Sequence, residues 1–474
     1  MAINNQHTSR EDLTRRELLK YGIYGGLAAG LSSGLWLGGC RKLYRGSRPN
    51  VVVILIDTLR PDYLGFYGYK KETAKFLAEV SKQSLVFTRA FAASSWTAPS
   101  TASLFTSRYP HQHGVIEGFF AHRRHVEQLR DKGKAQIALN SIPKQMPTLP
   151  EIFKSIGYGA FGVAANINIG SEMGFDRGFD RFERISQAPA SEIYVWVKKY
   201  EGEIKNARPY FLYLHPNDVH MPYHKREPYY EKQNDAREDF RARYISEIGY
   251  VDEYIERIYE VLRPVDNTIL LVISDHGEEF WEHGGTGHNA KMYRELTQVL
   301  MLLHAPFLRF RPRYITLNVS LIDVLPTLVE IVDGESVQKA EGISLVPLLK
   351  SNTSAKTLEE KLLNRVLFAH RIEDANTSPE HYWSEDNPEL QHWAAIYRHW
   401  NLIEHWESRK ELFDHKTDLM EQKNVFSEHP EVASRLLAEL QEFKKQGLRK
   451  YTEKTSANLD EKMLRTLKSL GYVE

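Results

Sequence analysis

Two stretches of continuous apolar, β-branched residues stand out along the chain. One is VVVILI at 51–56, and the other is TILLVIS at 268–274. A run without polar alternation is typical of a strand that is buried on both faces, as in a parallel sheet covered by helices. Segments 148–166 and 209–223 each add a strand, the first after a helical pattern and a glycine turn. Strands that alternate with helices predict a mostly parallel α/β sheet.

After EGISLVPLLK the chain becomes polar, and a different pattern follows. Short strand candidates, RVLFAHR and AAIYRHWNLIEHW, precede a helical pattern at 430–447. Neighbouring short strands without intervening helices indicate a separate β-sheet. We therefore expect a core domain at 50–350 and a smaller C-terminal subdomain at 351–474, an antiparallel sheet with helices and a helical tail.

A polar segment interrupts the core domain between residues 117 and 144. It contains the basic sequence HRRH at 122–125. Such a charge cluster is either a solvated face or a lid that receives an anionic substrate. The segment matches no pattern that names a substrate.

Residues 1–40 have the composition of a targeting segment. Arg15 and Arg16 precede an apolar run rich in glycine and alanine, which ends in LGGC at Cys40. This resembles a twin-arginine export signal joined to a bacterial lipobox, which implies cleavage before Cys40 and attachment of a lipid to its thiol. We then expect an exported protein in the periplasm or at the cell surface, anchored to the membrane by its lipid through a linker at 41–49. The alternative is an uncleaved anchor helix, because residues 21–39 nearly reach the length that spans a bilayer.

The charge and the cysteine content narrow the classes of partner and site. The 474 residues contain 62 Lys and Arg and 62 Asp and Glu, so no global field attracts nucleic acid, and we expect none as a partner. Cys40 is the only cysteine, which excludes an internal disulfide framework and any site built from several cysteines. Recognition of an anion must therefore be local.

Polar side chains follow both apolar runs directly. Asp57 ends the first run, and Asp275 and His276 follow the second. In open α/β sheets the ligand site lies beyond the carboxyl ends of the strands, so we expect these side chains at one edge. Carboxylates and an imidazole are ligands for a divalent metal, although each residue alone is equally an ordinary turn residue. Thr97 precedes Pro99 at the start of a predicted helix, where Thr also serves as an N-cap.

Further motifs, in order along the chain, resemble the sulfatase family of the alkaline phosphatase superfamily. TAPSTASLFTS at 97–107 overlays the motif in which sulfatases carry Cys or Ser, any residue, Pro, Ser, Arg and a Leu-x-Thr-Gly tail. The other matches are IDTLRPDYLGFYGY, GFDRGFDRF, LHPNDVHMPY, SDHGEEFWEHGGTGHNAKMYRE, LIDVLPTL, EGISLVPLL and ELFDHKTDLMEQKNV. The resemblance implies an alkaline-phosphatase-like fold, a mostly parallel sheet flanked by helices, with residues 50–350 as the catalytic domain.

The same resemblance implies the composition of an active site. One divalent metal (zinc, manganese or calcium) is expected on Asp57, Thr97, Asp275 and His276. A second metal, held by Asp218 together with His220 and His288, is a minority alternative. The implied catalytic residues are Thr97, His220 and His288, and the implied substrate-binding residues are Asn166, His283 and Lys291, with Asn168 nearby. For each histidine the alternative is a structural, hydrogen-bonded role.

Three departures from the family pattern bear on the reaction. Sulfatases oxidise the motif Cys or Ser to formylglycine, which Thr97 cannot form. Thr101 replaces the motif Arg, and AANINIG at 164–170 replaces a Gly-Lys-Trp-His stretch, so the pocket loses positive charges. Asp57-Thr58 replaces a pair of Asp residues in the first metal-binding strand. A threonine alkoxide forms a covalent phosphothreonine that water or an alcohol resolves. A sulfated threonine lacks the aldehyde's route for expelling sulfate.

These departures favour phosphorus over sulfur. We predict a metal-dependent hydrolase or phosphoryl transferase that acts on a phosphate mono- or diester or a phosphonate ester, with Thr97 as nucleophile. The substrate class is a small anionic ester, a glycan or a lipid headgroup. One alternative is a sulfatase that works without formylglycine. The other is a catalytically inactive surface protein that binds an anionic glycan or lipid.

Overall fold

The computed structural model describes residues 43–44, 46–116, 118–119, 136–262, 267–288, 291–335, 337, 339–350, 353–372, 391–446, 453–458, 463 and 465. Its centre is an eight-stranded sheet in the order β13-β2-β12-β8-β1-β7-β5-β6. In the middle lies β1 (Asn50–Ile56), parallel to β8 (Thr268–Ser274) on one side and to β7 (Tyr210–His215) on the other. The parallel order continues through β5 (Gly159–Ala164) and β6 (Arg181–Arg184).

The opposite edge of this sheet is mixed. There β12 (Met301–His304) is antiparallel to β8 and to β2 (Leu85–Phe87), and β13 (Arg313–Ile315) is parallel to β2. Most neighbouring strands are thus parallel, and helices cover both faces. The predicted α/β fold with a mostly parallel sheet is confirmed.

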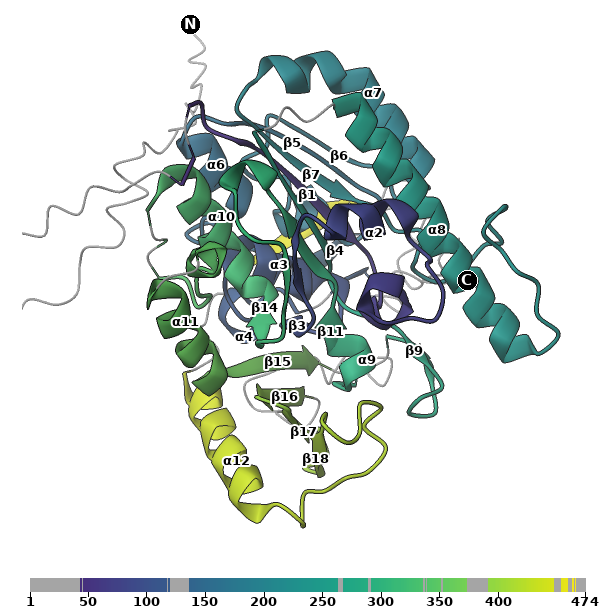
Figure 1. Cartoon of the computed structure of the whole chain (residues 1–474), viewed down its shortest axis with the longest axis vertical. Coiled ribbons are helices and arrows are strands. Elements are labelled where there is room, and N and C mark those ends of the chain that lie inside the picture. The colour runs from purple at the N-terminus through teal and green to yellow at the C-terminus, as the bar shows by residue number, and fades with distance from the viewer. Residues whose placement is uncertain are drawn as a thin grey trace, which may run out of the picture.

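Every residue of β1 is buried, because successive side chains point to two different cores. The first core contains side chains of α3 (Thr97–Thr106), α6 (Leu149–Ser155) and α10 (Val324–Asp333). The second contains side chains of α2 (Lys75–Ser81), α7 (Ala190–Asn206) and α8 (Ala236–Leu262). Helices α7 and α8 pack side by side (Figure 1). Full burial of each Val, Leu or Ile contributes roughly 1.5–3 kcal/mol, so the continuous apolar run holds β1 at the centre.

Helix α6 begins and ends on local signals in the sequence. The Thr148 N–H donates to Glu151 Oε2 at 2.9 Å, as one half of a capping box. Pro150 occupies the first turn, where its missing N–H costs nothing. After the helix, Gly157 has a φ of 90°, which favours glycine, and turns the chain into β5. The helix, turn and strand predicted at 148–166 are therefore confirmed.

The C-terminal part of the chain forms a second, antiparallel sheet, below the large sheet in the view of Figure 1. Its order is β15 (Val366–Ile372), β16 (Gln391–Tyr397), β17 (Trp400–Glu404) and β18 (Lys410–Asp414). Helix α11 (Thr353–Asn364) precedes it, and α12 (Pro430–Lys445) buries Leu436, Leu440 and Phe443 against it. The predicted C-terminal antiparallel sheet with a helix is confirmed.

The remaining elements are short. The ladders are β3 (Ala90–Phe91) with β11 (Gln298–Val299) and β14 (Val319–Ser320), β9 (Glu279–Phe280) with β10 (Thr286–Gly287), and β4 (Gln136–Ser141) with β19 (Glu453–Asn458). The short α-helices are α4 (Pro110–His113) and α9 (Arg294–Thr297). The 3-10 helices are Pro61–Tyr63, Gly65–Tyr67, Ser171–Met173, Pro306–Leu308, Leu321–Asp323 and Val346–Leu349.

Some expectations fall on parts of the chain without a described structure. The targeting segment 1–40 with Cys40, and residues 120–135 of the polar segment, lie outside the described residues. Within the expected helical tail, residues 453–458 instead pair with β4 as strand β19, because that ladder supplies their backbone hydrogen bonds. No helix within the described ranges combines the length and the hydropathy that crossing a membrane requires.

Candidate active site

The carboxyl ends of four adjacent strands of the large sheet carry polar side chains that meet in one place. Asp57 follows β1, His215 is the last residue of β7, and Asn166 lies just after β5. Asp275 and His276 follow β8. All five side chains are buried. The structure thus brings Asp57, Asp275 and His276 together at the sheet edge where the strand pattern predicts them.

The charges of this group fit a divalent cation. Asp57, His215 and Asp275 each offer one ligand atom, and these atoms all lie within 4.8 Å of one another. Among the described residues, no hydrogen-bond donor reaches Asp57 Oδ1 or Asp275 Oδ2, although both are buried. Two buried carboxylates at such a distance repel each other and lack solvation unless a cation lies between them. The residues present therefore fit a divalent metal.

Protonation in this group follows from burial and from neighbouring charges. Burial and the charge of Asp57 raise the pKa of Asp275 well above its usual range. Burial also acts to raise the pKa of Asp57, but the hydrogen bond with His215 and nearby imidazoles outweigh it and lower that pKa. Burial and the neighbouring His288 lower the pKa of His276 well below 6.5. His276 is therefore neutral, the form in which an imidazole binds a metal.

Backbone and side-chain donors orient each candidate ligand. The N–H groups of Thr58 and His276 donate to Asp275 Oδ1 at 3.1 and 2.9 Å. Asn166 Nδ2 donates to Asp57 Oδ2 at 2.6 Å. Tyr213 Oη lies 2.8 Å from His215 Nδ1, which leaves His215 Nε2 3.2 Å from Asp57 Oδ2. Such outer contacts fix the directions in which metal ligands point.

Thr97 is the first residue of α3, and its hydroxyl faces the group of candidate ligands. The N-cap is Trp96, not Thr97, so a helix-capping role for Thr97 is not what the structure shows. His276 Nδ1 donates to the carbonyl of Gly277 at 2.8 Å, so Nε2 is an acceptor. The Thr97 hydroxyl donates to this Nε2 at 3.1 Å. Ser100 Oγ donates to the carbonyl oxygen of Asp275 at 2.6 Å and ties the helix to the end of β8.

His220 and His288 lie next to this group. The ring centroid of His288 is 4.8 Å from that of His276 and 4.9 Å from that of His220. His220 Nδ1 donates to the carbonyl of Met221 at 2.6 Å. The three imidazoles thus form a row that ends at Thr97.

Asp218 does not point toward these histidines. Its Oδ2 accepts from the N–H of Ala190 at 2.9 Å, and its Oδ1 lies 3.1 Å from Arg226. Burial and the charge of Glu247 raise the pKa of Asp218 to about 7. The minority alternative of a second metal on Asp218 gains no support from this placement. Asn168 is likewise engaged, because its Oδ1 accepts from the N–H of Phe119 at 3.1 Å.

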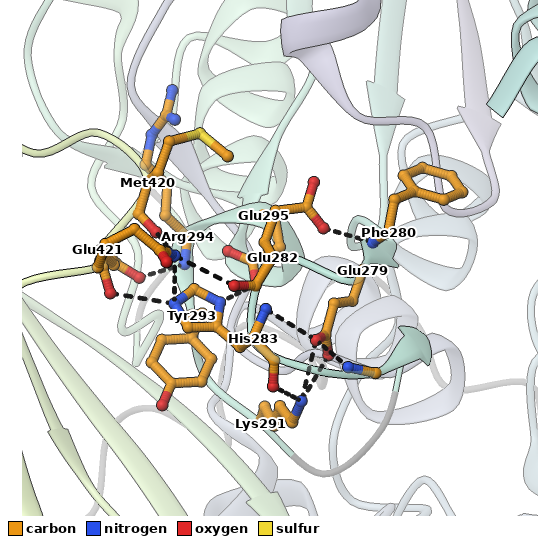
Figure 2. Close-up of polar contacts among 12 residues, drawn as sticks. Glu279, Phe280, Glu282, His283, Lys291, Tyr293, Arg294, Glu295, Met420 and Glu421 are labelled. Carbon is orange, nitrogen blue, oxygen red and sulfur yellow. Dashed lines mark hydrogen bonds and ion pairs between the residues drawn. The ribbon is translucent and has the colours of Figure 1, made fainter. Parts of the chain in front are cut away.

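His283 and Lys291 lie where the β9–β10 hairpin meets the C-terminal segment around Glu421 (Figure 2). His283 Nδ1 donates to Glu295 Oε1 at 2.6 Å, and Nε2 donates to the carbonyl of Glu421 at 3.0 Å. Lys291 Nζ lies 2.7 Å from Glu279 Oε2 and 2.9 Å from the carbonyl of His283. Both side chains therefore bind protein groups in this structure, and their role in substrate binding stays a prediction.

Three further residues of the site escaped the sequence reasoning, namely His215, Glu278 and Tyr223. His215 ends the apolar run YFLYLH as Asp57 ends VVVILID, so the rule applied to β1 would have selected it. Glu278 is buried, and accepts a hydrogen bond from Tyr223 and contacts His288. No local sequence pattern marks that contact, because it joins three separate segments.

Comparisons with known proteins agree with this arrangement. Residues 49–334 match the sulfatase family model. N-acetylgalactosamine-6-sulfatase of Homo sapiens is 22% identical over 400 residues, which covers 72% of this chain and 72% of the relative. The ulvan-active sulfatase of Formosa agariphila is 24% identical over 326 residues, 64% of this chain and 58% of the relative.

Solved structures share the fold. A 2-O GAG sulfatase superposes with a TM-score of 0.67 at 18% identity, covering 85% of this chain and 93% of that protein. The phosphonate monoester hydrolase of Agrobacterium radiobacter superposes with a TM-score of 0.63 at 17% identity, covering 84% and 96%. The family match spans most of the large sheet and every candidate ligand named above. The chain therefore belongs to the sulfatase family of the alkaline phosphatase superfamily and is a hydrolase of that family.

Proposed function

We propose that the protein is a metal-dependent hydrolase or phosphoryl transferase for phosphate or phosphonate esters, with Thr97 as the nucleophile. The observation that carries the proposal is the position of the Thr97 hydroxyl, 3.1 Å from His276 Nε2 at the start of α3. A threonine at this position has no route to formylglycine, and its own hydroxyl oxygen is the nucleophile in this proposal.

The metal ligands in this proposal are Asp57, Thr97, Asp275 and His276, with His215 in the same buried group. A divalent cation bound there would lower the pKa of the Thr97 hydroxyl and offset charge on the transferred group. Oxygen and imidazole ligands together suit zinc or manganese better than calcium, which prefers oxygen ligands alone.

The chain's own groups perform the transfer in two steps. The Thr97 oxygen, as the alkoxide, forms a bond to phosphorus while the bond from phosphorus to the leaving oxygen breaks. The N–H groups of Thr97 and Ala98 have no acceptor within the helix, so they stabilise the anion that faces the start of α3. Water or an acceptor alcohol then attacks phosphothreonine, and the bond from phosphorus to Thr97 breaks.

Phosphorus suits this residue better than sulfur. A formylglycine hydrate expels sulfate by collapse to the aldehyde, whereas a sulfated threonine has no such exit. Attack at phosphorus resolves a phosphothreonine directly. The sulfatase names of the relatives support the competing hypothesis, that the protein is a sulfatase that works without formylglycine. The phosphonate monoester hydrolase among the similar folds supports action on a phosphorus ester.

The test compares nitrophenyl phosphate, bis-nitrophenyl phosphate, a nitrophenyl phenylphosphonate and nitrophenyl sulfate as substrates of the purified protein. We expect a phosphorus ester to be hydrolysed fastest. Thr97→Ala should lose roughly 10³-fold or more in kcat, while Thr97→Ser keeps a hydroxyl and should retain part of the rate. Acid quenching followed by mass spectrometry should find phosphate on Thr97. A preference for the sulfate ester, or full activity of Thr97→Ala, would refute the proposal.

We also propose that the protein is exported and anchored by a lipid on Cys40. The support is the sequence alone, with Arg15 and Arg16 before an apolar run that ends in LGGC. Metabolic labelling with palmitate should mark the wild type, and Cys40→Ser should carry no label and leave the membrane fraction. A Cys40→Ser protein that stays in the membrane fraction would favour an uncleaved anchor helix.

A further inference from the structure

Glu278 is a buried carboxylate for which the proposed mechanism has no role so far. It lies between His276 and β9 and is not exposed to solvent. Its Oε2 accepts from the hydroxyl of Tyr223 at 2.5 Å, and its Oε1 lies 3.1 Å from His288 Nδ1. The hydroxyl of Tyr223 and the ring of His288 thus contact the two oxygens of the same carboxylate.

The surroundings hold Glu278 in one place. Arg60 Nη1 donates to the main-chain oxygen of Glu278 at 2.8 Å. The ring of Tyr223 packs edge-on against Phe240 and Tyr244, with centroids 4.9 and 5.3 Å apart. Burial and the charge of Glu278 raise the pKa of Tyr223, so its hydroxyl stays protonated and donates. The contact with Tyr223 therefore holds the carboxylate toward His288.

The contact with Glu278 decides which nitrogen of His288 faces the site. A carboxylate accepts only, so His288 Nδ1 carries the proton and donates it. Nε2, on the other side of the ring, is then the atom that can reach a substrate. Gly287 has a φ of 84°, a conformation that favours glycine, and turns the chain just before His288. The ring of His288 is 4.8 Å from that of His276, whose Nε2 accepts from Thr97.

We propose that Glu278, held by Tyr223, is a positioning residue that orients His288 so that its Nε2 exchanges protons with the leaving oxygen. This inference rests on the proposed function. In the first step the Thr97 oxygen bonds to phosphorus, the bond to the leaving oxygen breaks, and the Nε2 proton of His288 moves to that oxygen. In the second step the oxygen of a water molecule bonds to phosphorus, the bond from phosphorus to the Thr97 oxygen breaks, and Nε2 of His288 takes a proton from that water.

Glu278→Gln tests this role with little change in shape. The amide oxygen can still accept from Tyr223, but the amide NH₂ then faces His288 Nδ1 and donates to it. Neutral His288 then carries its proton on Nε2. A ring protonated at both nitrogens would set Nδ1–H against the amide NH₂, so only the neutral imidazole, a weaker acid, faces the leaving oxygen. Proton transfer from Nε2 should suffer, whereas the position of Thr97 should not.

The readout is the dependence of kcat on the leaving group. Nitrophenolate leaves without help, but an alkoxide needs a proton. The substrates are the nitrophenyl and benzyl esters of phosphate and of phenylphosphonate. We expect Glu278→Gln to lose roughly 100-fold in kcat on the benzyl esters, within the range of general acid catalysis, and about threefold or less on the nitrophenyl esters. Bound metal, measured by elemental analysis, should match the wild type.

The chain offers a matched control in its C-terminal sheet. Tyr293 donates to Glu411 Oε2 at 2.8 Å, and His405 Nε2 lies 2.7 Å from the same oxygen. This second Tyr–Glu–His group lies outside the set of candidate ligands. Glu411→Gln should therefore leave the ratio of benzyl to nitrophenyl rates unchanged. Tyr223→Phe is the milder variant at the site, and it should lower the same ratio by a smaller factor.

Each outcome decides the inference. An equal loss on both leaving groups, or no loss on either, overturns the positioning role while the proposed function stands. A wild type that hydrolyses none of these esters overturns both. If Glu278→Gln does not fold, Tyr223→Phe decides, and an unchanged rate ratio in that variant refutes the inference.

Discussion

His283 lies flat on the ring of Tyr293, with the ring centroids 3.5 Å apart and 4° between the planes. Both of its nitrogens donate, one to Glu295 and the other to the carbonyl of Glu421, so the ring is an imidazolium (Figure 2). This residue therefore joins the β9–β10 hairpin to α9 by charge and by stacking, and to the C-terminal segment by a hydrogen bond.

The charge on His283 predicts a loss of stability at high pH. Burial acts to lower the pKa of His283, but the hydrogen bond and charge of Glu295 outweigh it and raise that pKa to about 9. Burial raises the pKa of Glu295 as well. The two hydrogen bonds that His283 donates nevertheless require a protonated ring, so the pKa of His283 determines the pH range over which stability changes. Because the folded pKa exceeds the unfolded value, the contribution is complete below about pH 6.5 and is lost as pH rises through 9.

The test measures the Tm of His283→Gln and of the wild type by thermal unfolding over a range of pH. The difference in Tm should be largest at pH 6 and should shrink between pH 6.5 and pH 9.5. A difference that stays constant over this range would show that stacking on Tyr293, not charge, holds the contact.

Removal of metal should expose the repulsion between Asp57 and Asp275. We expect treatment with a chelator to lower the Tm of the wild type, because the buried carboxylates lose their counter-charge. Asp275→Asn should bind metal poorly, yet without metal it should be at least as stable as the metal-free wild type. Calorimetry with and without chelator measures both. A metal-free Asp275→Asn protein that unfolds well below the metal-free wild type would contradict the assigned repulsion.

His215 should contribute to metal affinity. Its Nε2 lies 3.2 Å from Asp57 Oδ2, so loss of the ring removes either a ligand or the group that orients one. We expect His215→Ala to weaken binding of zinc or manganese by roughly 10–100-fold. Tyr213→Phe removes only the contact to His215 Nδ1 and should weaken binding less. Titration with a competing chelator gives both affinities, and equal affinity in His215→Ala and wild type would exclude His215 from the site.

Leu440 should anchor α12 on the C-terminal sheet. It is fully buried in the core that this helix shares with β16, β17 and β18. Leu440→Ala should lower the free energy of unfolding by roughly 2–5 kcal/mol. Leu419 is 51% exposed, so Leu419→Ala should change it by about 0.5 kcal/mol or less. Unfolding in urea, followed by tryptophan fluorescence, compares the two, and similar effects would contradict the packing.

The parts of the site that follow strands were predictable, because a simple rule places them. A run such as 51–56 has no polar residue until Asp57, and a doubly buried strand must end where polarity returns. Asp275 likewise follows β8 directly, after the polar Ser274 has ended the apolar run. Since carboxyl ends of parallel strands share one edge, the sequence was enough to bring these two residues together.

The contacts that the sequence reasoning missed join segments that are far apart in the chain. The pattern of hydrophobic and polar residues predicts helices and strands but not which loops meet. His283 meets Glu421, and Glu278 meets Tyr223, only after the hairpin and the loops have packed. A histidine near a catalytic motif looks the same in sequence whether it faces a substrate or a structural carboxylate. Tertiary packing alone separates His288, beside His276, from His283, beside Tyr293.

The ladder between β4 and β19 constrains the order in which the chain acquires its structure. Ser141 pairs with Glu453, and Gln136 with Asn458, so residues 142–452, about two thirds of the chain, are synthesised between the two partners. On a ribosome, β4 can pair its backbone groups with β19 only after residues 453–458 have emerged. Closing such a distant contact is slow, and until it closes, the strand edge of β4 is open to pairing with other chains. The ladder between β4 and β19 therefore forms late, after residues 453–458 have been translated.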